Sequence, residues 1–270
     1  MRLVALLPLV CVLATSNQVP QRQYGQGWRR RGICVPPEVT PPGRAFYFTR
    51  AIYSDYYGRG GGDYYGRRRG RGSWSTDCPE ADQHFVLGLK HLTDIDAFDL
   101  QHLVPLEDPQ LRYFPLLYAV EVGRMSLTDS EVVGLRNYLL AGGMLIVDDF
   151  WGSREWANFE HEITRVLPEY SIVELPRDHA VLRTFYQIDS IVQVPNVRNG
   201  MSGGPTWEQD GYVPHLKAIF DDRGRLLVLI SWNSDLGDAW EWADDPFYPR
   251  MYSNYAVRLG VNMVLYGMTH

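Results

Sequence analysis

Two apolar runs with an amphipathic segment between them stand out in the middle of the chain. Residues 116–120 and 144–147 are almost wholly apolar, and Thr128 and Glu131 between them have the spacing of a helix capping box. The buried face of that helix is expected at Val132, Leu135 and Leu139. Gly142-Gly143 then ends the helix. Apolar runs that alternate with an amphipathic helix indicate a β-α-β unit in a parallel sheet.

Helical spacing of apolar residues predicts three further helices, which begin near Pro79, Ser153 and Asn254. Their buried positions are expected at Phe85, Leu89 and Leu92; at Trp156, Phe159, Ile163 and Val166; and at Val257, Val261, Val264 and Met268. Further strands are predicted at residues 44–52, 172–175, 188–194, 216–220 and 226–231. Strands that alternate with helices predict a single α/β domain, which extends from residue 44 to residue 270.

A polar turn follows the second apolar run, at Asp148-Asp149-Phe150-Trp151-Gly152. Ligands of parallel sheets bind beyond the carboxyl ends of the strands, so this turn is the first candidate site. Side chains alternate along a strand, so we expect one carboxylate to face the crevice and the other to cap the helix near Ser153. With Trp151 as a stacking wall, the pair suits a metal or a polar ligand. A structural cap beside a core tryptophan is the alternative.

Residues 231–245 form a second acidic and tryptophan-rich segment. We take Asn233, Asp235 and Trp240 from it as ligand-binding candidates, because hard cations prefer oxygen ligands. The spacing does not match a calcium-binding EF-hand loop. A solvated acidic loop with its tryptophans packed on the core is the alternative. A divalent metal therefore stays open, and no other cofactor is predicted, since phosphate-loop and dinucleotide-binding motifs are both absent.

Histidines beside carboxylates give two weaker candidates. Asp178 and His179 follow a predicted strand, where the pair suits a general base or an oriented ligand. Asp77, Asp82 and His84 lie at the start of the first helix and are secondary candidates. A surface histidine with ordinary hydrogen bonds is the alternative in both places. The sequence lacks the metalloprotease motif His-Glu-x-x-His and the hydrolase motif Gly-x-Ser-x-Gly.

The first 17 residues have the pattern of a secretion signal. Arg2 precedes an apolar run at residues 3–14, and small residues follow at Ala14-Thr15-Ser16. We therefore expect export to the periplasm or the extracellular space, with an uncleaved membrane anchor as the alternative. No later apolar stretch is long enough to span a bilayer. Cys34 and Cys78 would remain after cleavage, and the sequence leaves open whether they are bonded.

Charge is distributed unevenly along the chain, although the net value is only −6. Residues 18–72 carry eleven arginines and three acidic residues, whereas residues 73–270 carry a net charge of −15. We assign residues 18–43 to a Pro/Gln/Arg-rich linker and residues 53–75 to a flexible Tyr/Arg/Gly-rich insertion. Such a basic segment suits an anionic envelope polymer, an envelope protein or the acidic part of this chain. We do not expect nucleic acid as a partner of an exported protein.

Several segments together resemble one bacterial family, domain of unknown function 4159, within the glutamine amidotransferase-like (ThuA-like) superfamily. The resemblance covers residues 44–270 and rests on seven segments: FYFTRAIYS, ADQHF, FPLLYAVEVG, LTDSEVVGLRNYLLAGGMLIVDDFWGS, RDHAVLRTFY, WNSDLGDAWE and RLGVNMVLYGMTH. It implies a flavodoxin-like, class I glutamine amidotransferase-like three-layer sandwich with a mostly parallel central sheet. It implies no activity, because none is assigned to the family.

Amidotransferases of that superfamily carry a nucleophilic cysteine on the turn after the central strand. The corresponding turn here, residues 149–152, contains no thiol, so the cysteine–histidine mechanism cannot operate there. His179 lies in a segment similar to the ThuA-like histidine loop. We therefore favour a non-catalytic exported domain that binds a ligand or partner. A carboxylate- or metal-dependent hydrolase that uses Asp149 or Asp235, and an assembly protein that docks through its basic arm, are the alternatives.

Overall fold

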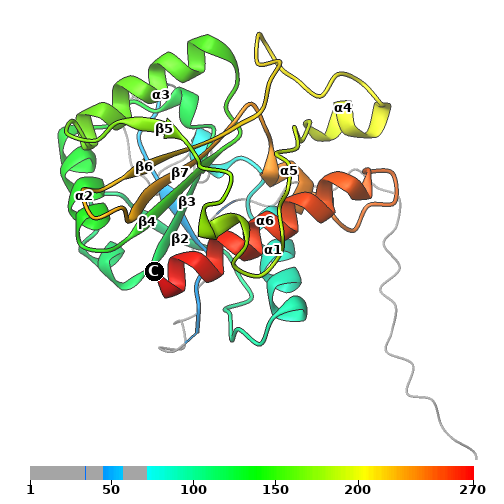
Figure 1. Cartoon of the computed structure of the whole chain (residues 1–270), viewed down its shortest axis with the longest axis horizontal. Helices are drawn as coiled ribbons and strands as arrows, with labels where there is room; N and C mark the ends of the chain where they lie inside the picture. The colour runs from blue at the N-terminus through cyan, green and yellow to red at the C-terminus, as the bar shows by residue number, and fades with distance from the viewer. Residues whose placement is uncertain (1–33, 35–44, 57–71) are drawn as a thin grey trace, which may run out of the picture. The chain divides into compact units, whose positions relative to one another are not determined.

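The computed structural model describes residues 34, 45–56 and 72–270, which form a seven-stranded sheet with helices on both faces (Figure 1). The strand order is β2-β1-β3-β4-β7-β6-β5. The strands are β1 (Thr49–Ile52), β2 (His102–Pro105), β3 (Leu116–Val120), β4 (Met144–Asp148), β5 (Ile172–Glu174), β6 (His215–Phe220) and β7 (Leu226–Trp232). β2, β1, β3, β4 and β7 are parallel, whereas β6 and β5 add an antiparallel edge.

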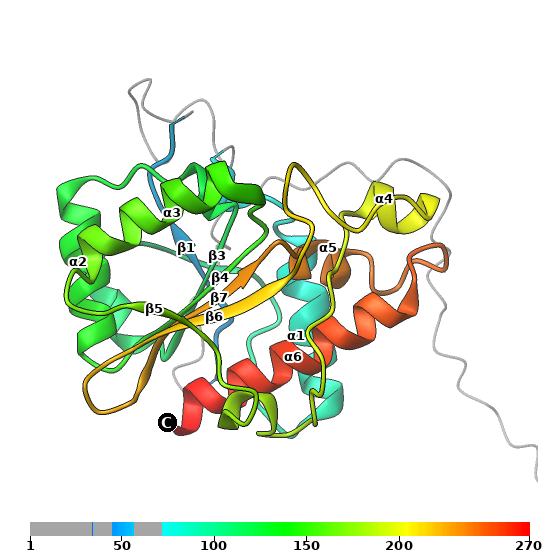
Figure 2. The ribbon, with the colours of Figure 1, turned by 45° about the horizontal axis from the view of Figure 1, so that its top comes forward.

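The helices form two layers, with α2 and α3 on one face of the sheet and α1, α5 and α6 on the other (Figure 2). The α-helices are α1 (Glu80–Leu92), α2 (Asp129–Leu140), α3 (Gly152–Val166), α4 (Val197–Ser202), α5 (Leu236–Glu241) and α6 (Arg250–Thr269). Four short 3₁₀ helices are η1 (Ser73–Ser75), η2 (Pro109–Tyr113), η3 (Val122–Arg124) and η4 (Ala180–Leu182). The prediction of an α/β fold with a mostly parallel sheet is confirmed. No helix among the described residues is long and apolar enough to cross a membrane.

The central β3-α2-β4 unit forms as its sequence predicts. The Thr128 side chain accepts from the backbone N–H of Glu131, and the Glu131 carboxylate accepts from the backbone N–H of Thr128 at 2.7 Å. This reciprocal capping satisfies two donors of the first turn of α2. β3 and β4 then pair in parallel register, from Leu116 opposite Met144 to Val120 opposite Asp148. The last residue of β4 therefore lies level with the end of β3.

Alternation along β4 sends side chains into both apolar layers. Met144 and Ile146 belong to the core cluster under α1 and α6, whereas Leu145 and Val147 belong to the cluster under α2 and α3. All five residues of β4 are buried. Such two-sided burial explains why residues 144–147 of β4 are a continuous apolar run rather than an alternating one.

Several expected elements differ from the structure. Residues 188–194 form no strand, because their backbone groups bond outside the sheet: Ile188 N donates to Leu182 O of η4, and Val194 O accepts from Asp235 N. β2, α4 and α5 were not predicted, since each is short. Helix α6 starts at Arg250, directly after Pro249, rather than after Asn254. Leu92 and Met268 are exposed rather than buried, because both lie at helix ends.

The predicted signal segment (residues 1–17), the linker (residues 18–43) and most of the insertion at residues 53–75 lie outside the described residues, with Cys34 as the exception. Cys34 and Cys78 form a disulfide, with Cα atoms 5.3 Å apart. Both cysteines are buried. The sequence left open whether Cys34 and Cys78 are bonded, and the structure shows that they are.

Candidate functional site

Asp148 connects three elements at the carboxyl edge of the sheet. Its Oδ2 accepts hydrogen bonds from the Tyr118 hydroxyl at 3.0 Å, from Leu236 N at 2.9 Å and from Gly237 N at 3.1 Å. The side chain is fully buried, and its Oδ1 has no hydrogen-bond partner among the described residues. Asp148 therefore caps α5, not α3, so the expected cap near Ser153 is provided by other residues.

Asp149 occupies the sharp turn between β4 and α3. Its backbone is left-handed, with φ 52°, and its Oδ1 accepts from the indole Nε1 of Trp151 at 2.8 Å. Trp151 is itself buried, so it orients Asp149 and offers no exposed stacking wall. Two backbone hydrogen bonds connect this turn to the residues after β7: Asp149 N donates to Ser234 O, and Asn233 N donates to Phe150 O.

Asp149 meets carboxylates from two other loops. Oxygens of Asp77, Asp149 and Asp235 all lie within 4.8 Å of one another, and all three residues are buried. Asp77 also belongs to a second such group, with Asp238 and Glu241 of α5. We call these five residues the acidic site. Oxygen atoms at these separations fit the coordination shell of a hard cation such as Ca²⁺ or Mg²⁺.

Burial dominates the electrostatics of this edge. It raises the pKa of Asp148 to about 7, against hydrogen bonds from Tyr118 and Gly237 N that lower it. The pKa of Asp149 is raised well above its usual value by burial and by the charge of Glu121. Burial and the charge of Asp149 likewise raise the pKa of Asp235. The group therefore needs protons or a cation to offset its charge.

The neighbouring helix end does not offer an anion site. Three side chains accept the first N–H groups of α3: Glu155 from Trp151 N at 2.7 Å, Asn233 from Gly152 N at 2.9 Å, and Asp210 from Ser153 N at 2.9 Å. In many α/β proteins these donors hold a phosphate or carboxylate of the ligand. Here protein oxygens already occupy them, so this edge favours cations over anions.

Left-handed backbone is concentrated at the same place. The described residues other than glycine with positive φ are Asp77 (61°), Glu121 (58°), Asp149 (52°), Gln209 (49°) and Asn233 (61°). Glu121, Asp149 and Asn233 directly follow β3, β4 and β7, and Gln209 donates to Glu155 Oε1 at 2.7 Å. Backbone of this kind is costly for non-glycine residues and tends to occur at functional sites.

A buried ion pair positions the segment that carries Asp77. The Arg50 guanidinium bonds Asp82 through Nε at 3.0 Å and Nη2 at 2.5 Å. Its Nη1 donates to Trp74 O at 3.0 Å and to Thr76 O at 2.8 Å. Asp82, a secondary candidate, is therefore a structural partner of Arg50, while Asp77 is part of the acidic site.

The remaining predicted residues fall in different places. Trp240 lies in α5, but its ring packs on Phe85 and Tyr118 in the core, with centroids 4.6 and 5.4 Å away. His84 Nδ1 lies 2.8 Å from the backbone oxygen of Glu241, beside the acidic site.

Asp178 and His179 lie at the opposite end of the sheet. The ring of His179 contacts Phe220, the last residue of antiparallel β6, at 5.3 Å between centroids, and Asp178 is exposed. The structure thus brings Asp149 and Asp235 together with Asp77, but it does not bring His179 to them.

Glu121 belongs to this edge but was not among the candidates taken from the sequence, whereas Asp238 and Glu241 were recognised only as part of the acidic segment at residues 231–245. Glu121 directly follows the apolar run of β3, so the strand-end argument that selected Asp148 would also have selected Glu121. Asp238 and Glu241 are three residues apart, a spacing that places them on one face of a helix. Predicting α5 as a helix would have revealed that pair.

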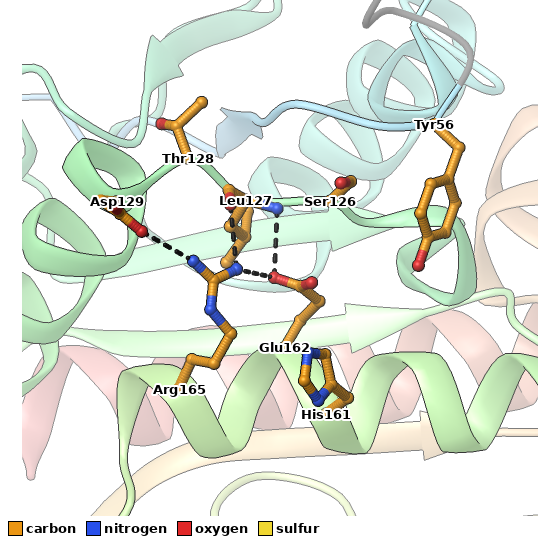
Figure 3. Close-up of a pocket in the computed structure, with 8 residues that line it drawn as sticks. All are labelled: Tyr56, Ser126, Leu127, Thr128, Asp129, His161, Glu162 and Arg165. Atoms are coloured by element: carbon orange, nitrogen blue, oxygen red, sulfur yellow. Dashed lines mark hydrogen bonds and ion pairs between the residues drawn. The ribbon is translucent and has the colours of Figure 1, made fainter.

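A separate pocket of about 470 Å³ lies between α3 and the start of α2 (Figure 3). It is lined by Tyr56, Ser126, Leu127, Thr128, Asp129, His161, Glu162 and Arg165. Arg165 bonds Glu162 at 2.6 Å and Asp129 at 3.0 Å, as the dashed lines in Figure 3 mark. The charge of Arg165 is thus balanced by the carboxylates of Glu162 and Asp129. This pocket shares no residue with the acidic site.

Comparison with known protein families gives a match. A family model described as "Domain of unknown function (DUF4159)" matches residues 64–268. No curated protein matches the chain.

Proposed function

The chain belongs to the DUF4159 family, whose function is unknown, and we propose that this domain binds a divalent cation, or a ligand presented with one, at the acidic site. One observation carries the proposal. Asp77, Asp149 and Asp235 come from three separate loops, yet their oxygens lie within 4.8 Å of one another in a buried position. Folding that many carboxylates together is unfavourable unless protons or a cation offset their charge.

The chemistry of the neighbours supports a cation rather than an anionic ligand. The N–H groups at the start of α3 are already bonded to Glu155, Asn233 and Asp210. Asp148 adds a buried oxygen, Oδ1, that has no hydrogen-bond partner among the described residues. Asp148 directly precedes Asp149 in the chain, and a buried carboxylate oxygen without a partner is the kind of atom that a cation or a water would satisfy.

We also propose that the fold is flavodoxin-like and that it belongs to the amidotransferase-like (ThuA-like) class. Support comes from the order β2-β1-β3-β4-β7, which corresponds to the flavodoxin order 2-1-3-4-5 when the antiparallel β5 and β6 are set aside. By that resemblance, the turn on which an amidotransferase carries cysteine corresponds to residues 149–152 of this chain, where Asp149 has a left-handed backbone. We propose a binding role without the amidotransferase cysteine mechanism, because that turn contains no thiol.

Export remains part of the proposal. The Cys34–Cys78 disulfide supports it, because disulfides persist in oxidising compartments such as the periplasm or the extracellular space. We therefore propose that the domain acts in the cell envelope.

The test is cation binding by the full chain after dialysis against EDTA, measured by calorimetry and thermal melting with Ca²⁺, Mg²⁺ and Mn²⁺. We expect saturable binding of at least one ion, with about 2.7 kcal/mol of added stability at a hundredfold excess over Kd. Asp149→Asn should abolish this response while it keeps an oxygen that accepts from Trp151 Nε1. Asp178→Asn makes the same chemical change at an exposed position and should leave binding intact. Absence of binding by all three ions would refute the proposal.

A carboxylate hydrolase is the second candidate, and one specific observation favours it. Burial raises the pKa of Asp149 well above its usual value, and a raised pKa favours the protonated carboxyl that a general acid needs. The test is hydrolysis of envelope carbohydrates and peptides by the full chain. Activity that Asp149→Asn abolishes and Asp178→Asn preserves would establish it, whereas an inactive wild-type chain would count against it.

A further inference from the structure

The disulfide lies directly beside the acidic site. Cys78 follows Asp77 in the chain, and Cys78 is bonded to Cys34. We infer that the Cys34–Cys78 disulfide holds Asp77 in place, so that the redox state of these cysteines controls the affinity of the acidic site for its cation. This inference rests on the proposed function.

Asp77 is the residue of the acidic site whose position depends on a covalent restraint of this kind. Asp149 and Asp235 follow adjacent strands β4 and β7, whose ends are bonded to each other through Asp149 N and Ser234 O. Asp148 adds bonds to Leu236 N and Gly237 N. Asp77, in contrast, comes from the irregular segment before α1. Its backbone oxygen accepts from Ala81 N at 2.9 Å, so its position follows from the contacts of that segment and of the first turn of α1.

Contacts hold this segment from both sides of Asp77. Before it, Arg50 bonds Trp74 O and Thr76 O, and Asp55 accepts from Ser73 N at 2.6 Å. After it, Cys78 is fixed by the disulfide. Asp77 lies between these hydrogen bonds and the disulfide. Its backbone is left-handed, a conformation that is strained for a residue other than glycine. Loss of the disulfide would let this backbone relax and would move the Asp77 carboxylate away from Asp149 and Asp235.

The coupling must act in both directions. If the oxidised form binds the cation more tightly, the cation must stabilise the disulfide against reduction by the same factor. Reduction by a dithiol transfers two electrons and two protons to the protein. The S–S bond breaks, Cys34 and Cys78 each gain a hydrogen, and the dithiol becomes a cyclic disulfide.

The first measurement compares the Kd of the full chain for Ca²⁺, Mg²⁺ and Mn²⁺ before and after treatment with dithiothreitol. Reduction should weaken binding about tenfold, within the usual range of coupling between sites. The double variant Cys34→Ser/Cys78→Ser should bind as weakly as the reduced wild type and should not respond to dithiothreitol. Circular dichroism and hydrogen exchange of β4 should show that the reduced domain remains folded.

The second measurement is reciprocal. The equilibrium between disulfide and thiols in a dithiothreitol buffer, read by thiol labelling and mass spectrometry, should shift toward the disulfide by the same factor when the cation is added. Equal Kd values in the two redox states, or a reduced domain that unfolds as a whole, would overturn the inference and leave the proposed function standing. If the oxidised chain binds none of the three ions, both proposals fail.

Discussion

The side-chain oxygen of Asn233 accepts a hydrogen bond from the backbone N–H of Gly152 at 2.9 Å, and this contact joins the end of β7 to the first residue of α3. The amide nitrogen of Asn233 donates in turn to Val213 O at 2.7 Å. Asn233 has φ 61°, a conformation that asparagine and glycine tolerate better than other residues. One side chain therefore caps α3, anchors the loop before β6 and accepts a left-handed backbone.

Substitutions at Asn233 separate the side-chain contacts from the backbone conformation. Asn233→Gly should lower the free energy of unfolding by about 1 kcal/mol, because a helix cap is lost while the backbone is unstrained. Asn233→Ala should lower it by about 2 to 3 kcal/mol, because the left-handed conformation adds strain. Urea unfolding of both variants measures the difference. Equal stability of the two variants would show that the left-handed backbone costs nothing here.

The raised pKa values predict how stability depends on pH. The pKa values of Asp148 and Glu121 are both raised to about 7 by burial, whereas unfolded carboxyls titrate near pH 4. Between about pH 4 and 7 the folded state therefore binds more protons than the unfolded state, so stability decreases as pH rises through this window. With EDTA present, the melting temperature should be higher at pH 5 than at pH 8.

A cation should reverse that trend, because it binds the deprotonated carboxylates. We expect the ion that binds to raise the melting temperature more at pH 8 than at pH 5. Asp149→Asn should reduce the pH dependence in EDTA, while Asp178→Asn should leave it unchanged. A melting temperature that rises from pH 5 to pH 8 in EDTA would contradict the assignment of these pKa shifts.

The sequence predicted those parts of the fold that depend on local periodicity and capping. The β3-α2-β4 unit is confirmed because its signals, the Thr128–Glu131 box and two continuous apolar runs, are satisfied within the unit itself. Residues 188–194 were wrong as a strand because an apolar run does not specify its partner. In the folded chain, Val194 bonds to Ser234 and Asp235 rather than to a neighbouring strand.

The candidate site was predicted only in part, because only some of its residues have a local sequence signal. Asp149 and Asp235 could be found because each follows an apolar run, and strand ends of a parallel sheet meet at one edge. The placement of Asp77 beside them depends on Arg50 and on the disulfide, which are contacts between distant parts of the chain. His179 was grouped with them by resemblance, but antiparallel β6 carries the neighbouring Phe220 to the opposite edge.

Gly237 gives a test of the site that leaves its carboxylates in the sequence. A Cβ added at Gly237 would lie 2.6 Å from Asp77 Oδ2, 3.1 Å from the Tyr118 hydroxyl and 3.6 Å from Asp235 Oδ1. The closest atom is the end of a side chain, so Gly237→Ala should fold but displace the Asp77 carboxylate. We expect cation affinity to fall about 10- to 100-fold, as for other changes around metal ligands.

Gly88→Ala is the matched control for that substitution. Gly88 lies inside α1, and its added Cβ would meet only Val257 Cγ1, at 3.9 Å. This variant should gain up to about 1 kcal/mol of stability from helix propensity and keep its cation affinity. Calorimetry on both variants makes the comparison. Unchanged affinity in Gly237→Ala would mean that Asp77 is not a ligand.

The ion pair of Arg50 and Asp82 should contribute to both stability and binding. Both side chains are fully buried, so Arg50→Met leaves an unpaired carboxylate and should cost about 3 to 5 kcal/mol of stability. The double variant Arg50→Met/Asp82→Leu removes that unpaired charge and should recover much of the loss. It still lacks the donors to Trp74 O and Thr76 O, so the Asp77 segment stays loose and cation affinity should remain low. Urea unfolding and calorimetry on the single and double variants distinguish the two effects. Recovery of stability and affinity together would show that Arg50 serves only to neutralise Asp82.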